Sequence, residues 1–81
     1  MKQNELEEEE SFPIRIYPKA DLAVLYCPDF AISTAMRNLA AWIRKNHALW
    51  LALQAIGYNR YRRCFMPREV ELIVEYLGTP Y

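Results

Sequence analysis

The stretch STAMRNLAAWIRKN, residues 33–46, decides the fold because its apolar side chains recur at the spacing of one helix face. The recurring apolar residues are Met36, Leu39, Ala40 and Ile43. Positions i, i+3, i+4 and i+7 share one side of an α-helix, so the spacing predicts a helix from Ser33 to about Asn46 with that side against a core. Ser33 is expected to cap this helix, because its hydroxyl can accept a hydrogen bond from a backbone N–H of the first turn.

The other side of this predicted helix is basic. It carries Arg37, Ala41, Arg44 and Lys45. The charge of the whole chain follows the same trend, because residues 1–10 contain one base and five acids whereas residues 11–81 contain nine bases and five acids, a net charge of +4. A basic folded part favours an anionic partner.

A short strand and a first helix are expected before this stretch. Residues Ile14–Tyr17 alternate apolar and polar side chains, which predicts a half-buried strand, and Pro18 then suits the first turn of a helix. That helix is expected from about Lys19 to Tyr26. It should end before Pro28, because the residue preceding a proline avoids helical geometry.

Two more helices are expected after it. The third runs from about Ala48 to Ile56, and Gly57 stands where a left-handed residue ends a helix. The last begins at Pro67 and ends at Gly78. Its inward residues are expected to be Val70, Ile73, Val74 and Leu77, and its outward residues Glu69, Glu71 and Glu75.

Between these helices, Arg63–Phe65 can form a second strand that pairs with Ile14–Tyr17. The predicted fold is therefore mainly α: a small four-helix domain with a helix-turn-helix-like pair and a minimal two-stranded sheet. If the strands do not pair, it is a plain four-helix arrangement. The domain is expected over residues 12–81, after a disordered acidic tail over residues 1–11, which is either a solubilising extension or a competitor of nucleic acid for the basic surface.

Several classes of function lack the residues they need. Cys27 and Cys64 are too few for a disulfide framework and are expected to be ordinary thiols, and with the single His47 they give no zinc-ligand spacing. The only glycines, Gly57 and Gly78, are explained as helix ends, so no phosphate loop is present. We therefore expect no catalytic residue, metal or cofactor, and no enzyme.

The location of the protein is suggested by two missing signals. No apolar run approaches the roughly 18 residues of a membrane span. The N-terminal residues lack the apolar region of a secretory signal. A cytoplasmic protein without a membrane partner is expected.

Double-stranded DNA is the partner that the basic residues favour. Ser33 and Thr34 would meet phosphate at a helix N-terminus. Arg37, Asn38 and Arg44 would face the major groove, where arginine grips guanine and asparagine grips adenine. The residues expected to hold the phosphate backbone are Arg60, Arg62 and Arg63, and Lys45 on the basic side of the helix is a further candidate for nucleic-acid contact.

A protein-interaction module is the alternative, without nucleic-acid binding. Aromatic side chains are enriched at interface hot spots. Trp50, Leu51 and Tyr61 are the candidates for contact with a partner protein or a second copy of the chain, whereas Trp42 is expected in the core. DNA binding predicts affinity that falls steeply with salt, and protein interaction predicts a constant that changes little.

The chain also resembles a family of short bacterial proteins through motifs that extend from Ile16 to Pro80. These are Ile16-Tyr17-x-Lys19-x-x-Leu22-Ala23-x-Leu25-Tyr26-x-Pro28, Leu39-x-x-Trp42-Ile43, Leu53-x-x-x-Gly57-Tyr58 and Phe65-x-Pro67-x-x-Val70-x-x-Ile73-x-x-x-Leu77-Gly78-x-Pro80. They resemble domain of unknown function 4248, a resemblance that implies no catalytic residues. The chain departs from the pattern at Thr79, where an acid is common, and at Met66, where a capping threonine is typical; the lost cap should cost about 1 kcal/mol.

A second resemblance concerns the order of the first two helices. The Lys19-x-x-Leu22-Ala23 helix, a turn and the Ser33–Asn46 helix are similar to the first two helices of excisionase-like helix-turn-helix proteins. This resemblance implies that the second helix would enter the DNA major groove.

Overall fold

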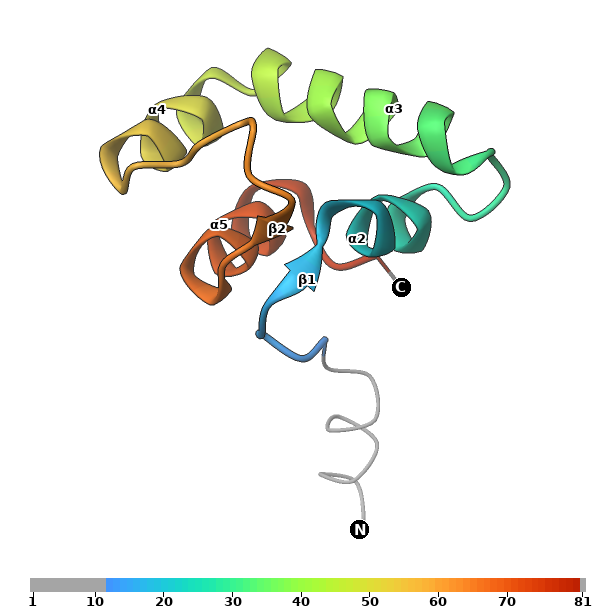
Figure 1. The fold of residues 1–81 in the computed structure, drawn as a ribbon. Helices are drawn as coiled ribbons and strands as arrows, with labels where there is room; N and C mark the ends of the chain where they lie inside the picture. The colour runs from blue at the N-terminus through green and yellow to red at the C-terminus, as the bar shows by residue number, and fades with distance from the viewer. Residues whose placement is uncertain (1–11, 81) are drawn as a thin grey trace, which may run out of the picture.

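The computed structural model describes residues 12–80 of the chain (Figure 1). Its elements in chain order are β1 (Tyr17–Pro18), α2 (Lys19–Tyr26), α3 (Ile32–Lys45), α4 (His47–Ala55), β2 (Cys64–Phe65) and α5 (Pro67–Leu77). These elements confirm the predicted mainly α domain with a minimal sheet. The prediction of a disordered tail over residues 1–11 lies outside the described residues.

Strands β1 and β2 form a two-stranded antiparallel sheet in which Tyr17 pairs with Phe65 and Pro18 with Cys64. The predicted pairing of the two segments is confirmed, but the first strand is shorter than expected. Ile14 and Ile16 are 45% and 48% exposed, so the prediction of a half-buried strand from Ile14 was wrong. The reason is that the opposite segment leaves the sheet to enter α5 at Pro67 and offers no further strand partner.

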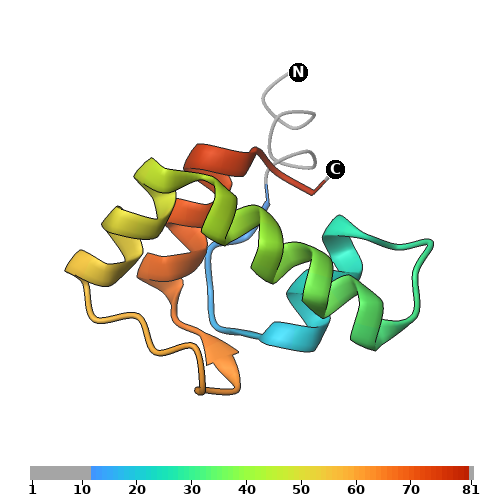
Figure 2. The same cartoon turned by 90° about the horizontal axis from the view of Figure 1, so that it is seen from above.

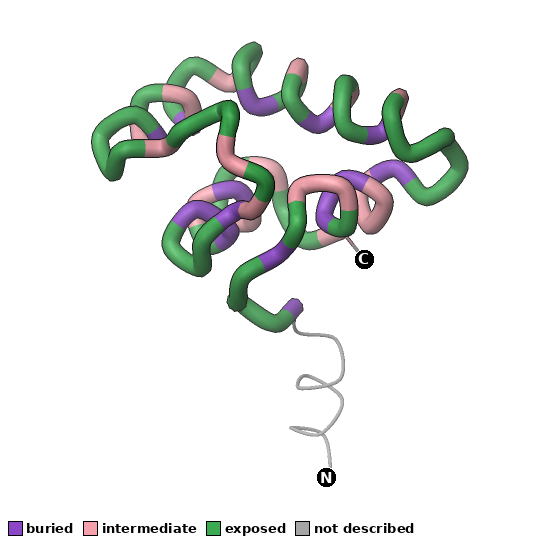
Figure 3. The backbone as a smooth tube through the Cα atoms, in the orientation of Figure 1, coloured by how far each residue is buried: buried purple, intermediate pink, exposed green. Residues whose placement is uncertain are grey.

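Helices α3 and α4 lie in one layer, above α2, the sheet and α5 (Figure 1). Seen from above, α3 crosses over α2 and leads into α4 (Figure 2). The side of α3 that faces the lower layer is buried (Figure 3). Its buried residues are Ala35, Leu39 and Ile43.

The buried side of α3 is rotated relative to the prediction. Met36 is 40% exposed and Ala40 is also exposed, so neither belongs to the core as expected. Ala35 is fully buried instead, as is Ala23 on α2. Small side chains at both positions are compatible with close packing of α2 and α3. Met36 lies at the edge of this contact, where it lines a pocket together with Lys19 and Ala23 of α2.

The N-terminus of α3 also differs from the prediction. The helix begins at Ile32, its N-cap residue is Ala31, and no side-chain hydrogen bond caps it. The first helical hydrogen bond runs from the Ala35 N–H to the Ala31 carbonyl over 2.8 Å. Ser33 therefore lies inside the first turn, and the prediction that it is the cap was wrong. Asn46 does cap α4, because its Oδ1 accepts the Leu49 N–H at 3.0 Å.

The core brings together all the elements of the described domain. Its buried apolar residues are Phe12, Tyr17, Leu22, Ala23, Cys27, Ala35, Leu39, Ile43, Leu49, Leu53, Phe65, Val70 and Ile73. Trp42 is not among them: it is 41% exposed, in contrast to the prediction, and its ring meets that of Tyr26 edge-on at 6.4 Å. Cys27 and Cys64 are both free thiols, as expected.

Helix α5 buries Val70 and Ile73 as predicted, but Glu69 is buried too, although it was expected to point outward. Only 3% of Glu69 is exposed. Gly57 and Gly78 have φ angles of 82° and 86°, and Gly78 is the C-cap residue of α5, in agreement with their predicted places at helix ends. No helix within residues 12–80 is long and apolar enough to cross a membrane.

Candidate nucleic-acid interface and the adjoining groove

The outer side of α3 presents the basic residues predicted for DNA recognition. Arg37, Arg44 and Lys45 are exposed, and Asn38 and Ala41 between them are half-exposed. This side lies opposite the buried one because residues 37, 41 and 44 are about half a turn from Leu39 on the helix. None of residues 32–45 is acidic, so the potential along this exposed side is positive.

Ser33 and Thr34 lie in the first turn of α3, where they were predicted to meet phosphate. Ser33 is exposed and Thr34 is half-exposed, and the first turn contains no acid. Two large apolar side chains accompany them, since Phe30 is 53% exposed and Ile32 is 59% exposed. The approach to this helix end therefore combines free backbone N–H groups with an apolar rim.

The segment 58–63 runs beside α3 and brings a second set of bases to it. Arg60 lines a small hollow together with Arg44, so these two predicted residues lie on a common surface. The Arg60 guanidinium lies 5.0 Å from the centre of the Tyr61 ring and donates to the Tyr61 hydroxyl at 2.9 Å. Arg63 is exposed on the same segment, and Tyr61 is 80% exposed.

Arg62 has a different environment from its neighbours. Its guanidinium forms an ion pair with the buried Glu69 carboxylate, at an N···O distance of 2.5 Å. Only 34% of the Arg62 side chain is exposed, and its Nε is buried with no hydrogen-bond partner among the described residues. Arg62 therefore holds the segment against α5, and the phosphate contact predicted for it stays a prediction.

Lys19 anchors this segment from the other side and is absent from the residues predicted for the site. Its Nζ donates to the carbonyls of Asn59 at 3.2 Å and Arg60 at 2.9 Å, and lies 4.7 Å from the centre of the Tyr58 ring. Burial, followed by the nearby Arg62 charge, lowers the pKa of Lys19. A base in the first turn of a helix opposes the helix dipole, and this is the sequence signal that Lys19 has another role.

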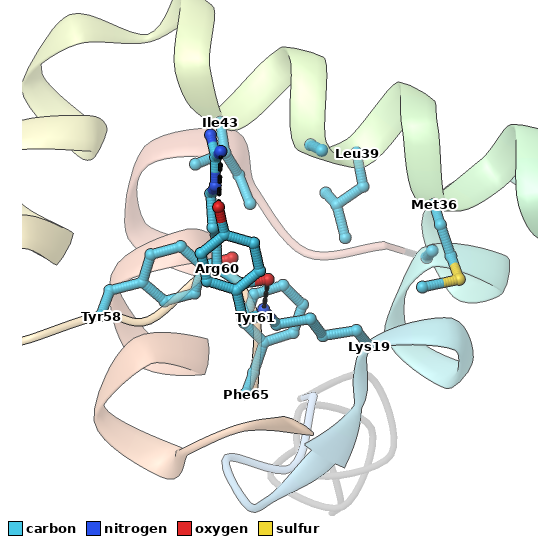
Figure 4. Close-up of a pocket in the computed structure, with 10 residues that line it drawn as sticks. Lys19, Met36, Leu39, Ile43, Tyr58, Arg60, Tyr61 and Phe65 are labelled. Atoms are coloured by element: carbon cyan, nitrogen blue, oxygen red, sulfur yellow. Dashed lines mark hydrogen bonds between the residues drawn. The ribbon is translucent and has the colours of Figure 1, made fainter. Parts of the chain in front are cut away.

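A groove separates α3 from segment 58–65 (Figure 4). Its central pocket has a volume of about 420 Å³ and is lined by Lys19, Ala23, Met36, Leu39, Ala40, Ile43, Tyr58, Arg60, Tyr61 and Phe65. Two further hollows share lining residues with this pocket. One includes Ile43 and Arg60 and extends to Trp50, and the other includes Met36 and Tyr61 and extends to Arg63. We call this continuous feature the α3 groove.

The three residues predicted for a protein interface come from two parts of the chain, Trp50 and Leu51 from α4 and Tyr61 from segment 58–63. Trp50 is half-buried, packs against the core and meets the Tyr58 ring edge-on at 6.5 Å. Trp50 lines a hollow with Tyr61, and Leu51, which is 54% exposed on α4, is not part of that lining. Tyr61 and Leu51 are therefore exposed. The Trp50 ring, in contrast, stabilises the domain through its packing on the core and on Tyr58.

No group of three or more His, Cys, Asp or Glu side chains that could hold a metal ion occurs within residues 12–80. The fold and this surface define a small, mainly helical domain with a minimal antiparallel sheet and a basic helix exposed along one side. The chain belongs to the family described as Domain of unknown function (DUF4248), whose model matches residues 13–80. This match confirms the family resemblance of the sequence motifs. Neither a curated protein nor a solved structure matches the chain.

Proposed function

We propose that this protein binds double-stranded DNA through the outer side of α3. The observation that carries the proposal is a 14-residue helix at one side of the domain whose exposed charges are all basic. A helix of this length extends about 20 Å, and the major groove, about 12 Å wide, admits an α-helix. Helices α2 and α3, packed across each other, have the order of a helix-turn-helix pair.

The residues on the outer side and in the first turn of α3 have separate roles in this proposal. Arg37 and Arg44 reach base edges, where a guanidinium can donate two hydrogen bonds to guanine, and Asn38 can pair with adenine. The half-exposed Ala41 between them allows the helix to approach the base pairs closely. Ser33 and Thr34 lie at the end of the helix where its dipole favours a phosphate.

The phosphate backbone would be held by bases beside the helix, namely Lys45, Arg60 and Arg63. All three are exposed. The exposed acids Glu71 and Glu75 are on α5, which lies in the other layer of the domain from α3 (Figure 1). This separation of charge supports an orientation in which α3 faces DNA and α5 faces away.

The proposal is tested by fluorescence anisotropy with a mixed-sequence duplex at low and moderate salt. We expect binding that weakens steeply with salt, and a lower affinity for Arg44→Ala. Arg68→Ala is the matched control, because Arg68 is 70% exposed but belongs to α5. Absence of binding at low salt, or equal loss for Arg44→Ala and Arg68→Ala, would overturn the proposal.

Self-association is a second candidate, favoured by the 80% exposure of the Tyr61 ring and the 54% exposure of Leu51. Exposed apolar side chains of this size are typical of contact surfaces. Sedimentation velocity at two salt concentrations separates this candidate from the first. A dimer that persists at high salt and is lost in Tyr61→Ser or Leu51→Ser would support it, and a monomer at all concentrations would exclude it.

A further inference from the structure

One side of α3 is apolar and uncovered. Ile32, Met36 and Ala40 follow one another at intervals of four residues, so they form a line along the helix between its buried and its basic sides. Ile32 is 59% exposed and Met36 is 40% exposed. Met36 and Ala40 belong to one wall of the α3 groove, because they line its central pocket together with residues of segment 58–65. Figure 4 shows Met36 on α3 beside this pocket.

The opposite wall is aromatic and basic. Tyr58 and Phe65 stack with ring centres 6.0 Å apart, and Tyr61 projects beside them with the Arg60 guanidinium over its ring. These rings are positioned by the buried sheet and by the Lys19 hydrogen bonds, so the wall is formed before any partner arrives. A preformed apolar wall lowers the ordering cost of binding.

The charged residues that line the α3 groove are all basic, and one of them, Arg62, is paired with the buried Glu69 behind the lining. The central pocket and the two hollows that adjoin it are lined by no acid, and their charged residues are Lys19, Arg44, Arg60, Arg62 and Arg63. Two of the three N–H groups of the Lys19 ammonium donate to backbone carbonyls. A carboxylate that entered the groove could accept a hydrogen bond from the third N–H group. Its negative charge would favour the charged form of Lys19, which burial disfavours.

We infer that the α3 groove binds an acidic amphipathic helix of a partner protein. Apolar side chains at i, i+3, i+4 and i+7 of that helix would pack between Met36 and Tyr61, because a line of side chains at four-residue spacing fits the ridges of a second helix. Carboxylates beside them would pair with Arg60 and Lys19. The inference goes beyond DNA binding and is tested without DNA.

Two other occupants fit the structure less well. A second copy of the chain offers Glu71 and Glu75, but α5 already packs its apolar side into its own core. The acidic segment 1–10 has the required charge, but residues 12–16 lie below β1, on the side of the domain away from α3 (Figure 1). A partner's helix brings both the apolar and the acidic side chains, and neither a core of its own nor the position of residues 12–16 restricts its access to the groove.

The experiment uses a displayed library of helical peptides, with leucine fixed at i, i+3, i+4 and i+7 and the other positions drawn from Glu, Gln, Lys, Ser and Ala. We expect selection against the full chain to enrich glutamate over lysine. A selected peptide should lose at least tenfold in affinity for Met36→Glu and for Arg60→Glu, with circular dichroism confirming that both variants fold. Ile14→Glu, which changes an exposed apolar residue outside the groove, should bind the peptide as the unmodified chain does.

Three outcomes would overturn the inference. The first is enrichment of lysine, or no enrichment, and the second is equal affinity for Met36→Glu and the unmodified chain. The third concerns the competing occupants and has two forms. In one, peptide affinity rises tenfold when Glu7, Glu8, Glu9 and Glu10 are replaced by Gln in the full chain. In the other, self-association seen in sedimentation is abolished by Glu71→Gln combined with Glu75→Gln. Either of these last results would assign the groove to the chain itself.

Discussion

The Arg62 guanidinium donates to the Glu69 carboxylate, which is 3% exposed and also accepts the Met66 N–H at 2.8 Å. One side chain thus joins segment 58–63 to the first turn of α5. An anionic group at this helix end is favoured by the helix dipole. Glu69 therefore supplies the carboxylate half of a capping box, while Met66 offers no side-chain oxygen for the other half.

Removal of this carboxylate should be among the most destabilising single changes in the domain. Glu69→Ala leaves the half-buried Arg62 charge without its partner and the Met66 N–H without an acceptor, so we expect a loss of about 3 kcal/mol in the free energy of unfolding. Glu69→Gln retains an acceptor of similar volume and should lose less. Urea unfolding followed by circular dichroism measures both, and a loss below about 1 kcal/mol for Glu69→Ala would contradict the assigned role.

The neighbouring arginines should separate stability from DNA affinity. Arg63 is exposed, so Arg63→Ala should leave the unfolding midpoint unchanged, weaken DNA binding uniformly across sequences and reduce the salt slope by about 1. Arg62→Ala should lower the midpoint instead, because it leaves the buried Glu69 charge unpaired. Anisotropy and urea titrations on the same two variants provide the test, and a normal midpoint for Arg62→Ala would refute the distinction.

Much of the fold follows from local sequence signals, but the orientation of side chains on α3 does not. The helix order, the strand pairing and the two glycine ends depend on patterns within a few residues. Ala35 and Met36 give neighbouring and equally periodic choices for the buried side of α3, and hydropathy favours the larger Met36. The choice is decided by how α3 packs against the lower layer of the domain, which is a tertiary contact and buries Ala35.

The candidate site divides in the same way. Exposure of Arg37 and Arg44 was predictable, because a basic side chain opposite an apolar stripe turns toward solvent. The burial of Glu69 was not, since a carboxylate in a first turn is usually solvated and only the fold brings Arg62 to it. The α3 groove also depends on the path of segment 58–65, which no periodicity specifies.

Tyr26 gives the domain a predicted alkaline limit. Its hydroxyl donates to the Gly78 carbonyl at 2.5 Å, and burial raises the pKa of Tyr26 from 10.0 to about 12. The folded chain therefore keeps this proton at a pH where the unfolded chain has lost it. The stabilisation is complete below pH 10 and is lost as the pH rises toward about 12.

Two measurements test this assignment. Burial also raises the pKa of Tyr58, so absorbance at an ultraviolet wavelength specific for tyrosinate should show a late titration step to which both rings contribute. The late step should be smaller in Tyr26→Phe than in the unmodified chain. Urea midpoints of Tyr26→Phe should also fall less between neutral and strongly alkaline pH than those of the unmodified chain. If the late step keeps its full size in Tyr26→Phe, the step belongs to another tyrosine.

The N-terminus of α3 offers a prediction in which a substitution should stabilise the protein. Ala31 holds the N-cap position with φ −60° and ψ 155°, a conformation that serine adopts readily, and contributes no side-chain acceptor. Ala31→Ser should therefore raise the free energy of unfolding by about 1 kcal/mol. Ser33→Ala should change it by less than about 0.5 kcal/mol, because Ser33 is an exposed residue within the first turn. Thermal and urea unfolding of the two variants measure the difference, and a larger loss for Ser33→Ala than the gain for Ala31→Ser would move the cap back to Ser33.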